Sequence, residues 1–167
     1  MHNSSIKEMT RFIDTYLKDK QNIYILDVGS YDVNGSYKNL FIKNTWMYRG
    51  LDVIKGPNVD IIALDMYNWN ILNNSFDVVI SGQAFEHIEY PWKVLEEIVR
   101  ITKLGGLICI IVPSAGKDEH RYPIDCWRIF PDGMKALAKM VNNLEILECY
   151  RNKNLPFMDC VLIGKKI

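Results

Sequence analysis

Residues 23–36 read Ile-Tyr-Ile-Leu-Asp-Val-Gly-Ser-Tyr-Asp-Val-Asn-Gly-Ser, and this stretch decides the fold class. Its first part, 23–28, is largely apolar and β-branched, as expected for a buried strand. Gly29 then follows, and the polar residues 30–36 favour turns over regular structure. The stretch therefore predicts a strand that opens into a loop at its carboxyl end.

Strands and helices alternate outward from this stretch. Further strands are predicted over 45–52, 59–64, 76–81 and 107–112. Helices are predicted over 5–19, starting at a capping box from Ser5 to Glu8, from Pro91 to a carboxyl-terminal cap at Gly105-Gly106, and over 132–142. Two last apolar stretches, 144–150 and 157–163, are expected to pair as an antiparallel hairpin. This alternation predicts an α/β fold with a doubly wound, mostly parallel sheet and helices on both faces.

The composition is that of a globular protein without excess charge. The 167 residues include 20 Lys+Arg and 20 Asp+Glu, and the formal net charge is +0. A protein that grips nucleic acid through its phosphates normally carries a basic excess, so no nucleic-acid partner is expected. The longest purely apolar run, 107–112, is far below the roughly 18 residues of a membrane span. Charged residues near the amino terminus also argue against a signal peptide, so we expect a cytoplasmic protein without a membrane partner.

No repeat or flexible linker divides the chain, which is expected to form a single domain, 1–167. Its parts are predicted to be an amino-terminal helix (1–20), a cofactor-binding core (21–142) and a carboxyl-terminal hairpin (143–167). The four cysteines form no C-x-x-C pair, so we expect reduced thiols and no zinc site. We expect a monomer or a homodimer.

Acidic and small side chains follow the predicted strands. Because ligands of doubly wound sheets sit at the carboxyl ends of the strands, these positions are the candidate site. Gly29 permits close approach of a ligand to the backbone, and Asp52 follows Asp27 at about the spacing at which an acid meets a ribose diol. A carboxylate accepts two hydroxyl hydrogen bonds at once. The spacing therefore indicates a ribose-bearing cofactor.

The loop after the first strand argues against a dinucleotide. A pyrophosphate needs a glycine-rich backbone, whereas Gly29 is followed by Ser30, Tyr31 and Asp32. Asp27 and Asp32 would also repel an anion. S-adenosylmethionine has a ribose but no phosphate, and its sulfonium and ammonium cations suit nearby carboxylates. We therefore expect S-adenosylmethionine as the cofactor and S-adenosylhomocysteine as the product.

Six short motifs follow one another in a familiar order. They are Leu26-Asp27-Val28-Gly29-Ser30, Gly50-Leu51-Asp52-Val53, Asp65-Met66, Phe76-Asp77-Val78-Val79-Ile80-Ser81, Phe85-Glu86-His87-Ile88 and Leu104-Gly105-Gly106-Leu107. In their order and spacing, from about residue 23 to 137, the chain resembles the class I S-adenosylmethionine-dependent methyltransferases, especially small bacterial proteins with a type-11 methyltransferase domain. The resemblance implies a Rossmann-like fold. One departure is Tyr31, which stands where the family usually has a second glycine and would cover the cofactor or weaken its binding.

The resemblance also implies roles for the residues at the strand ends. Asp27, Gly29 and Ser30 would line the methionine moiety, and Asp52 would bind the ribose hydroxyls. Val53 and Met66 would flank the adenine, and Asp65 would accept its amino group. Gln83 would lie near the transferable methyl group. The expected cofactor-binding residues are Asp27, Gly29, Ser30, Tyr31, Asp52, Val53, Asp65, Met66, Ser81 and Gln83.

His87 and the loop before the last helix are candidates for the acceptor side. His87 could act as a general base, or it could bond a backbone carbonyl and organise its loop. Aromatic and charged side chains of the loop could hold a polar acceptor, or anchor the loop through Trp127 and an ion pair of Arg128. The expected acceptor residues are His120, Arg121, Tyr122, Trp127 and Arg128. Ubiquinone-type O-methyltransferases hold a metal with Glu, Glu and His in a similar segment, but Gln83 stands at the first of these positions, so we expect no metal.

The predicted function is methyl transfer to an oxygen or nitrogen of a polar small molecule, with a sugar or glycan precursor as one candidate. One alternative is a methyltransferase-like module that binds a cofactor or partner without turnover. Another is a nicotinamide-dependent oxidoreductase, which the first loop disfavours. Three arrangements remain open for the acceptor: it brings its own surface, loop 114–130 folds over it, or a second subunit completes its pocket.

Overall fold

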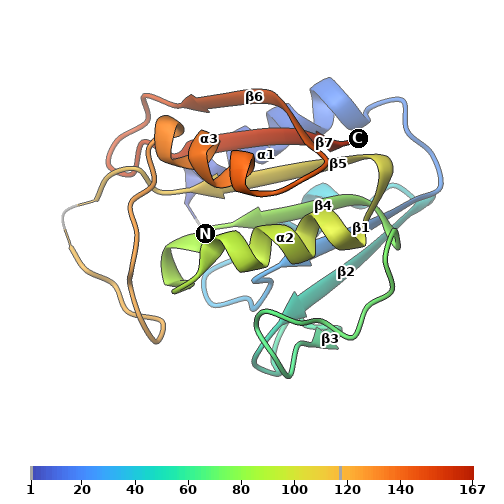
Figure 1. Ribbon diagram of the computed structural model, residues 1–167, viewed down its shortest axis with the longest axis horizontal. Coiled ribbons are helices and arrows are strands. Elements are labelled where there is room, and N and C mark those ends of the chain that lie inside the picture. Colours follow the sequence, from blue (N-terminus) through green and yellow to red (C-terminus); the bar gives the residue numbers. More distant parts are fainter. Residues whose placement is uncertain (1, 117) are drawn as a thin grey trace.

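Residues 2–116 and 118–167, which the computed structural model describes, form one seven-stranded sheet between two layers of helices (Figure 1). The strands are β1 (Ile23–Val28), β2 (Trp46–Asp52), β3 (Ile61–Ile62), β4 (Phe76–Gly82), β5 (Thr102–Val112), β6 (Leu144–Arg151) and β7 (Cys160–Lys166). The helices are α1 (Asn3–Phe12), which continues into the π-helical turn η1 (Ile13–Leu17), α2 (Pro91–Ile101) and α3 (Pro131–Met140). Two short 3₁₀ turns are η2 (Lys38–Leu40) and η3 (Phe85–His87).

The strand order is β3-β2-β1-β4-β5-β7-β6. Strands β1 to β5 pair in parallel, and β7 runs antiparallel to both β5 and β6. The order reverses beside β1, because the chain proceeds outward through β2 and β3 and then returns to place β4 on the other side. Such a reversal leaves a crevice at the carboxyl ends of the two diverging strands. The predicted doubly wound, mostly parallel sheet with a carboxyl-terminal antiparallel hairpin is confirmed.

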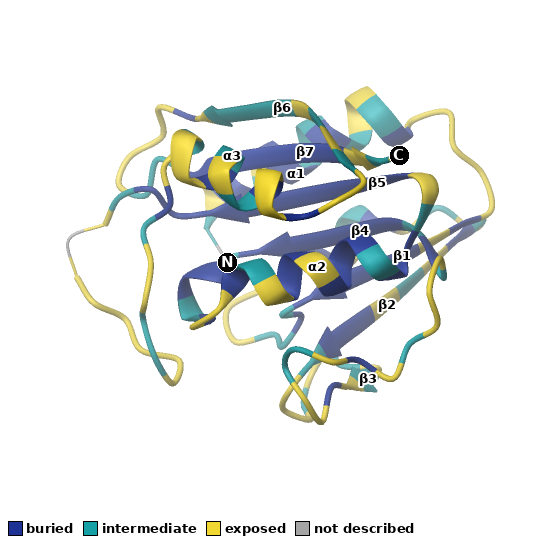
Figure 2. Ribbon diagram, viewed as in Figure 1, coloured by how far each residue is buried: buried dark blue, intermediate teal, exposed yellow. Residues whose placement is uncertain are grey.

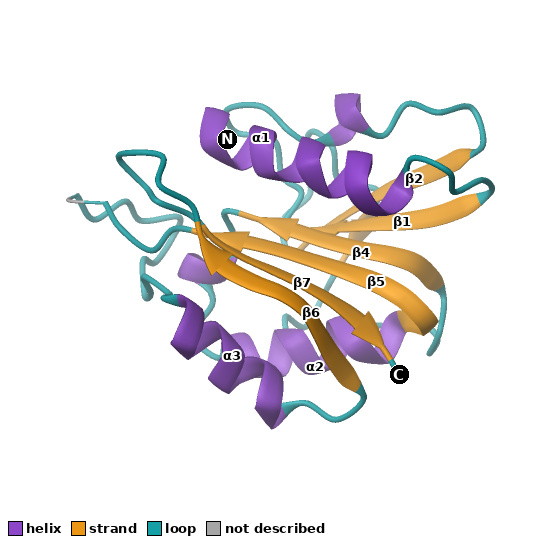
Figure 3. Ribbon diagram, turned by 90° about the horizontal axis from the view of Figure 1, so that it is seen from above, coloured by secondary structure: helices purple, strands orange, loops and turns teal. Residues whose placement is uncertain are grey.

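Helices cover both faces of the sheet (Figure 3): α1 lies on one face, and α2 and α3 lie on the other. Met9 and Phe12 of α1 belong to one buried cluster, and Leu95 and Ile98 of α2 belong to a second. The central strands are therefore buried on both sides (Figure 2), which explains their continuous apolar sequences. Among the described residues, no helix is both long and apolar enough to cross a membrane.

The prediction that Gly105-Gly106 cap a helix is wrong. Helix α2 ends at Ile101, and the chain enters β5 directly at Thr102. The glycine pair lies within β5, where Gly105 has a φ of +76°. The register of the β4–β5 pairing shifts next to this point, so the glycines form an irregularity in a strand.

The capping box predicted at Ser5 is also absent from α1. The helix begins at Asn3, with His2 as its amino-terminal flanking residue. Ser5 is fully buried, and its hydroxyl forms a hydrogen bond with Tyr37 instead of capping the helix. Burial against a residue distant in the chain therefore takes this side chain away from the local role.

Besides β5, which begins five residues before the predicted 107, the third and the last strand differ clearly from their predicted bounds. Of the stretch 59–64, only Ile61–Ile62 forms a strand, at the edge of the sheet. β7 begins at Cys160 instead of residue 157, because the Phe157 carbonyl accepts the backbone N–H groups of loop residues 114 and 115. This contact fixes the loop that follows β5, which contributes to the site described next.

Candidate functional site

A cavity of about 380 Å³ lies at the carboxyl ends of β1 and β4, where the strand order reverses. Its volume falls in the range of about 300–1,000 Å³ that is typical of sites for small molecules. Its wall comes mainly from 27–31, 33–36, 51–54, 82–84, 87–88 and 120–123. These segments lie at the carboxyl ends of β1, β2 and β4, in the loops that follow them, and in the loop after β5. The sequence-predicted site residues on this wall are Asp27, Gly29, Ser30, Tyr31, Asp52, Val53, Met66, Gln83, His87, His120, Arg121 and Tyr122.

Gly29 brings the loops after β1 and β4 together. Its φ is +77°, in the left-handed region that favours glycine, and a Cβ at this position would lie 2.4 Å from the Cβ of Ala84. The N–H groups of Gly29 and Ser30 both donate to the Leu51 carbonyl, at 2.9 and 3.1 Å. The first loop therefore turns tightly over the end of β2 and leaves the cavity open between β1 and β4.

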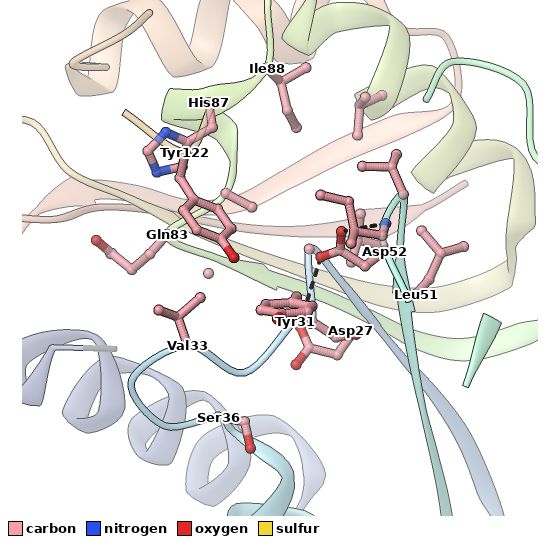
Figure 4. A pocket seen from close by; sticks show the side chains of 18 of the residues that line it. Asp27, Tyr31, Val33, Ser36, Leu51, Asp52, Gln83, His87, Ile88 and Tyr122 are labelled. Atoms are coloured by element: carbon pink, nitrogen blue, oxygen red, sulfur yellow. Dashed lines mark hydrogen bonds between the residues drawn. The ribbon is translucent and has the colours of Figure 1, made fainter. Parts of the chain in front are cut away.

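Asp52 lies at the end of β2 and faces the cavity (Figure 4). One carboxylate oxygen accepts the backbone N–H of Tyr31 at 3.1 Å, and the other accepts that of Ile54 at 3.2 Å. These two bonds fix the orientation of a half-buried carboxylate. Each oxygen has a further lone pair that can accept a hydroxyl group.

Tyr31 replaces a glycine of the usual motif without blocking the cavity. Its ring packs so closely on Gly56 that a Cβ there would lie 2.0 Å from a ring carbon. Its ring centroid lies 6.1 Å from that of Tyr122, which comes from the loop after β5. The ring therefore forms part of the wall, and the backbone N–H of the same residue orients Asp52.

Asp27 is a buried carboxylate at the end of β1, with 3% of its surface exposed. The Tyr48 hydroxyl donates to it at 2.5 Å. Burial raises the pKa of Asp27 to about 7, and the nearby charge of Asp52 acts in the same direction. A cationic ligand in the cavity would favour the ionised form of this group.

The burial of Asp27 predicts a pH-dependent stability. Between about pH 5 and 7, the unfolded chain has this carboxylate ionised, whereas the folded protein still holds much of the proton. Unfolding then releases protons, so the free energy of unfolding should fall as the pH rises through this window. The free energy of unfolding, measured by urea titration at about pH 5 and about pH 7, should fall less for the Asp27→Asn variant than for the parent. An equal fall for both proteins would contradict the raised pKa.

Gln83, His87 and Tyr122 lie across the cavity from Asp52 and Leu51 (Figure 4). The Gln83 backbone has a φ of +57°, which is rare for a residue with a side chain. Its Nε2 donates to buried Asp159 at 3.1 Å, and its Oε1 has no hydrogen-bond partner among the described residues. The strained backbone therefore holds Gln83 at the cavity with a side-chain oxygen that accepts no hydrogen bond from the described residues.

His87 bonds a backbone carbonyl and also faces the cavity. Its Nδ1 lies 2.6 Å from the Ile124 carbonyl, so Nδ1 carries the proton and donates it. Burial lowers the pKa of His87, which keeps the imidazole neutral at pH 7, with a lone pair on Nε2. The loop-organising contact considered in the sequence is thus present, and it leaves Nε2 available as a base.

Glu86 precedes His87 in η3 and is fully buried. Neither of its carboxylate oxygens has a hydrogen-bond partner among residues 2–116 and 118–167. Its Oε1 lies 3.8 Å from Nε2 of His87. Burial raises the pKa of Glu86 to about 8. A buried carboxyl group without a partner among the described residues is costly, and this one lies next to His87, which lines the cavity.

Two residues predicted to bind the cofactor lie outside the cavity wall, namely Asp65 and Ser81. Asp65 is exposed, and its carboxylate accepts the backbone N–H of Tyr67 at 2.8 Å within a turn. Ser81 is buried, and its hydroxyl donates to the Val28 carbonyl at 2.8 Å. Ser81 therefore ties β4 to β1 below the cavity.

Trp127 and Arg128, predicted to contact the acceptor, do not reach the cavity either. The Trp127 indole donates to the Ile88 carbonyl at 2.8 Å. Arg128 donates to both carboxylate oxygens of Asp125, at 2.6 and 2.7 Å. Both side chains thus hold the loop in place, which is the anchoring role that the sequence left open as an alternative to acceptor binding. Of the predicted acceptor residues, His120, Arg121 and Tyr122 line the cavity.

The sequence gives no sign that the amino terminus reaches the site. His2 lies on the cavity wall and stacks on Phe157, with ring centroids 3.6 Å apart. The Ser4 hydroxyl donates at 2.6 Å to Asp159, which also accepts from Gln83. No local motif marks His2 or Asp159, because their neighbours at the site are distant in the chain.

A family model described as "Methyltransferase domain" matches residues 26–110, just over half of the chain. The matched segment contains the ends of β1, β2 and β4, which form most of the cavity. A demethylmenaquinone methyltransferase from Paenarthrobacter aurescens is 39% identical over 54 residues, which are 32% of this chain and 21% of that protein. The match thus spans about a fifth of the relative's length.

Solved structures extend the likeness to the whole fold. A SAM dependent methyltransferase from Aquifex aeolicus has a TM-score of 0.68 at 16% identity, and the alignment covers 100% of both chains. The 1,6-didemethyltoxoflavin-N1-methyltransferase of Burkholderia thailandensis, determined with 1,6-didemethyltoxoflavin and S-adenosylhomocysteine, has a TM-score of 0.74 at 12% identity. That alignment covers 98% of this chain and 78% of the other. At these identities, the likeness establishes a shared fold.

Proposed function

Because this chain belongs to the methyltransferase domain family, we propose that it binds S-adenosylmethionine and transfers the methyl group to an oxygen or nitrogen of a small polar acceptor. The observation that carries the proposal is the division of the cavity. An oriented carboxylate, Asp52, lies on one side, and the hydrogen-bonding groups of Gln83 and His87 lie on the other (Figure 4). The first side suits a cofactor with a ribose, and the second suits an acceptor.

The residues present fit the chemistry of this cofactor. Asp52 has lone pairs for the two ribose hydroxyls. Val53 and Ile54 follow it on the wall, and Met66 adds a third apolar side chain, so an adenine ring would find an apolar surface beside the ribose position. The buried carboxylate of Asp27 suits a positively charged ligand. Asp65, which lies outside the wall, is no longer proposed as a ligand of the adenine.

When bound, S-adenosylmethionine supplies a methyl group on a positively charged sulfur, which a nucleophilic oxygen or nitrogen can attack in line. The chain's residues align the reactants, which by itself can lower a barrier by several kcal/mol. Nε2 of neutral His87 would take the proton of an acceptor hydroxyl. Tyr31 and Tyr122, whose rings lie near each other across the opening, would limit the access of water.

We propose a sugar-type or similarly polar acceptor. Gln83 Oε1 is a buried hydrogen-bond acceptor for which the described part of the chain supplies no donor, and a hydroxyl group would supply one. Tyr122 and His120 add a ring face and further polar atoms to the same side of the cavity. The loop containing them follows β5 and lines the cavity, which supports the proposal that this chain supplies part of the acceptor site itself.

Isothermal titration of the purified protein with S-adenosylhomocysteine tests the proposal, with a nicotinamide dinucleotide titrated in parallel. We expect saturable binding of S-adenosylhomocysteine and none of the dinucleotide, because the first loop offers no pyrophosphate cradle. Binding of the dinucleotide alone would favour an oxidoreductase, and binding of neither would favour a module that has lost the cofactor. A subsequent screen of polyhydroxylated acceptors with isotope-labelled S-adenosylmethionine identifies the methylated atom.

A further inference from the structure

The three histidines of the chain gather at one cavity. His2, His87 and His120 all lie on its wall, although they come from the amino terminus, the turn after β4 and the loop after β5. The rings of His87 and His120 meet edge to face, with centroids 4.8 Å apart. Neutral imidazole is a common ligand of divalent transition metals. The convergence therefore places metal-ligand chemistry at the acceptor side of the cavity.

Glu86 completes a set of potential ligands. One ligand atom from each of Glu86, His87 and His120 lies within 4.8 Å of the other two. The carboxylate of Glu86 is fully buried and has no hydrogen-bond partner among the described residues. Carboxylates are common on protein surfaces without any ligand, but a buried one without a donor needs a cation or a proton. This second observation distinguishes the cluster from a chance grouping of polar side chains.

The surroundings orient the two imidazoles. Nδ1 of His87 donates to the Ile124 carbonyl at 2.6 Å, which directs the lone pair of Nε2 away from the backbone. Histidines that bind metals usually donate their other ring N–H in this way. The backbone N–H of His120 donates to Asp125 at 2.8 Å. The Glu86 carbonyl accepts two backbone N–H groups of the same loop, from residues 126 and 127. The turn and the loop are therefore fastened together around the cluster.

We propose that Glu86, His87 and His120 bind one divalent transition-metal ion of the zinc class, with at least one coordination position open to the cavity. Two imidazole nitrogens, one carboxylate oxygen and a free position match the ligand pattern of catalytic rather than structural sites. Bonds of about 2.1 Å require ligand atoms about 3–3.5 Å apart, so the cluster must contract by about 1 Å. The side chain of His120, 54% exposed, is free to make this movement.

The ion would hold an oxygen of the acceptor, and this part of the inference rests on the proposed function. A bound transition metal lowers the pKa of an oxygen ligand strongly, as zinc does for water. With the ion present, the lone pair of His87 Nε2 becomes a ligand. The metal-bound hydroxyl of the acceptor would then lose its proton to solvent water, and the resulting oxygen would attack the methyl group. The sequence predicted no metal because Gln83 stands at one of the ligand positions of the ubiquinone-type enzymes. His120 comes from a separate loop and was not among the ligands considered there.

Titration with zinc tests the site. The chelator-treated and desalted protein is titrated with Zn²⁺ by calorimetry, together with Glu86→Gln and His120→Ala. The matched control is Glu119→Gln, which removes a negative charge from the exposed residue next to His120. We expect one equivalent of zinc for the parent and the control, and at least about tenfold weaker binding for the two ligand variants. A parallel titration with Co²⁺ should show no thiolate charge-transfer band, because no cysteine belongs to the set.

Each outcome is decisive. No saturable binding by the parent, equal binding by all variants, or a thiolate band from exposed Cys126 would overturn the proposal. Circular dichroism and urea titration of the same four proteins show whether the variants are folded, and S-adenosylhomocysteine is titrated into the parent separately. If S-adenosylhomocysteine fails to bind while zinc binds as expected, the proposed function fails and the metal site stands. The reverse result leaves the proposed function intact and removes the metal site.

Discussion

Replacing Asp52 with alanine should weaken the binding of S-adenosylhomocysteine by about 100-fold or more. The carboxylate is held at the end of β2 by the backbone N–H groups of Tyr31 and Ile54, and it faces the cavity. Each ribose hydroxyl that it accepts forms a hydrogen bond to a charged group, worth about 1.5–3 kcal/mol. The loss of two such bonds gives the expected factor, and isothermal titration measures it directly.

Asp65→Ala is the matched control for this experiment. Asp65 is also a carboxylate at the end of a strand segment, but it is exposed and lies outside the cavity wall. Its replacement should leave the affinity within about threefold of the parent. Because Asp52 also bonds the backbone, a urea titration of Asp52→Ala should accompany the binding data. An unchanged affinity of a folded Asp52→Ala protein would contradict the assignment of the ribose to this residue.

Gly29→Ala should lower the free energy of unfolding by about 3 kcal/mol. The added Cβ would lie 2.4 Å from the Cβ of Ala84, and the backbone has a φ of +77°. The left-handed conformation costs about 1–2 kcal/mol for a residue with a side chain, and overpacking adds about 1–3 kcal/mol. Cofactor binding should fall as well, because the loop that carries Tyr31 would move. Urea denaturation followed by circular dichroism measures the stability.

Gly105→Ala separates the two parts of this cost. Gly105 has nearly the same φ, +76°, but a Cβ there would meet no atom within 4 Å. Its replacement should cost only about 1–2 kcal/mol, from the backbone conformation alone. In the Gly29→Ala background, Ala84→Gly removes the clashing methyl group and should restore part of the stability. Equal costs for Gly29→Ala and Gly105→Ala, without rescue by Ala84→Gly, would exclude the clash as the cause.

Local patterns were sufficient for most of the fold. The apolar runs of β1, β4 and β5 predict buried parallel strands, because only a sheet covered on both faces accepts such sequences. The errors concern segments whose conformation depends on distant partners. Gly105-Gly106 look like a helix cap, but pairing with β4 draws the chain into β5 immediately after α2. Ser5 looks like a cap, but Tyr37 binds its hydroxyl in the core.

The same distinction applies to the site. The parallel sheet brings the carboxyl ends of its strands to one edge, so the sequence could predict that Asp27, Gly29 and Asp52 face a common cavity. It could not predict which side chains of a long loop reach that cavity. Within the loop after β5, Tyr122 faces the cavity and Arg128 pairs with Asp125, and the two differ through tertiary contacts.

The sequence by itself determined the order of strands and helices, the single sheet and the acidic residues at its carboxyl edge, because periodicity and turn chemistry act over a few neighbouring residues. Only the tertiary structure decided that His2 and Asp159 reach the cavity and that His120 approaches Glu86 and His87. The physical reason is that burial and hydrogen bonding between distant segments set these positions. Glu86 shows this most clearly, since only the folded surroundings leave its carboxyl group without a hydrogen-bond partner among residues 2–116 and 118–167.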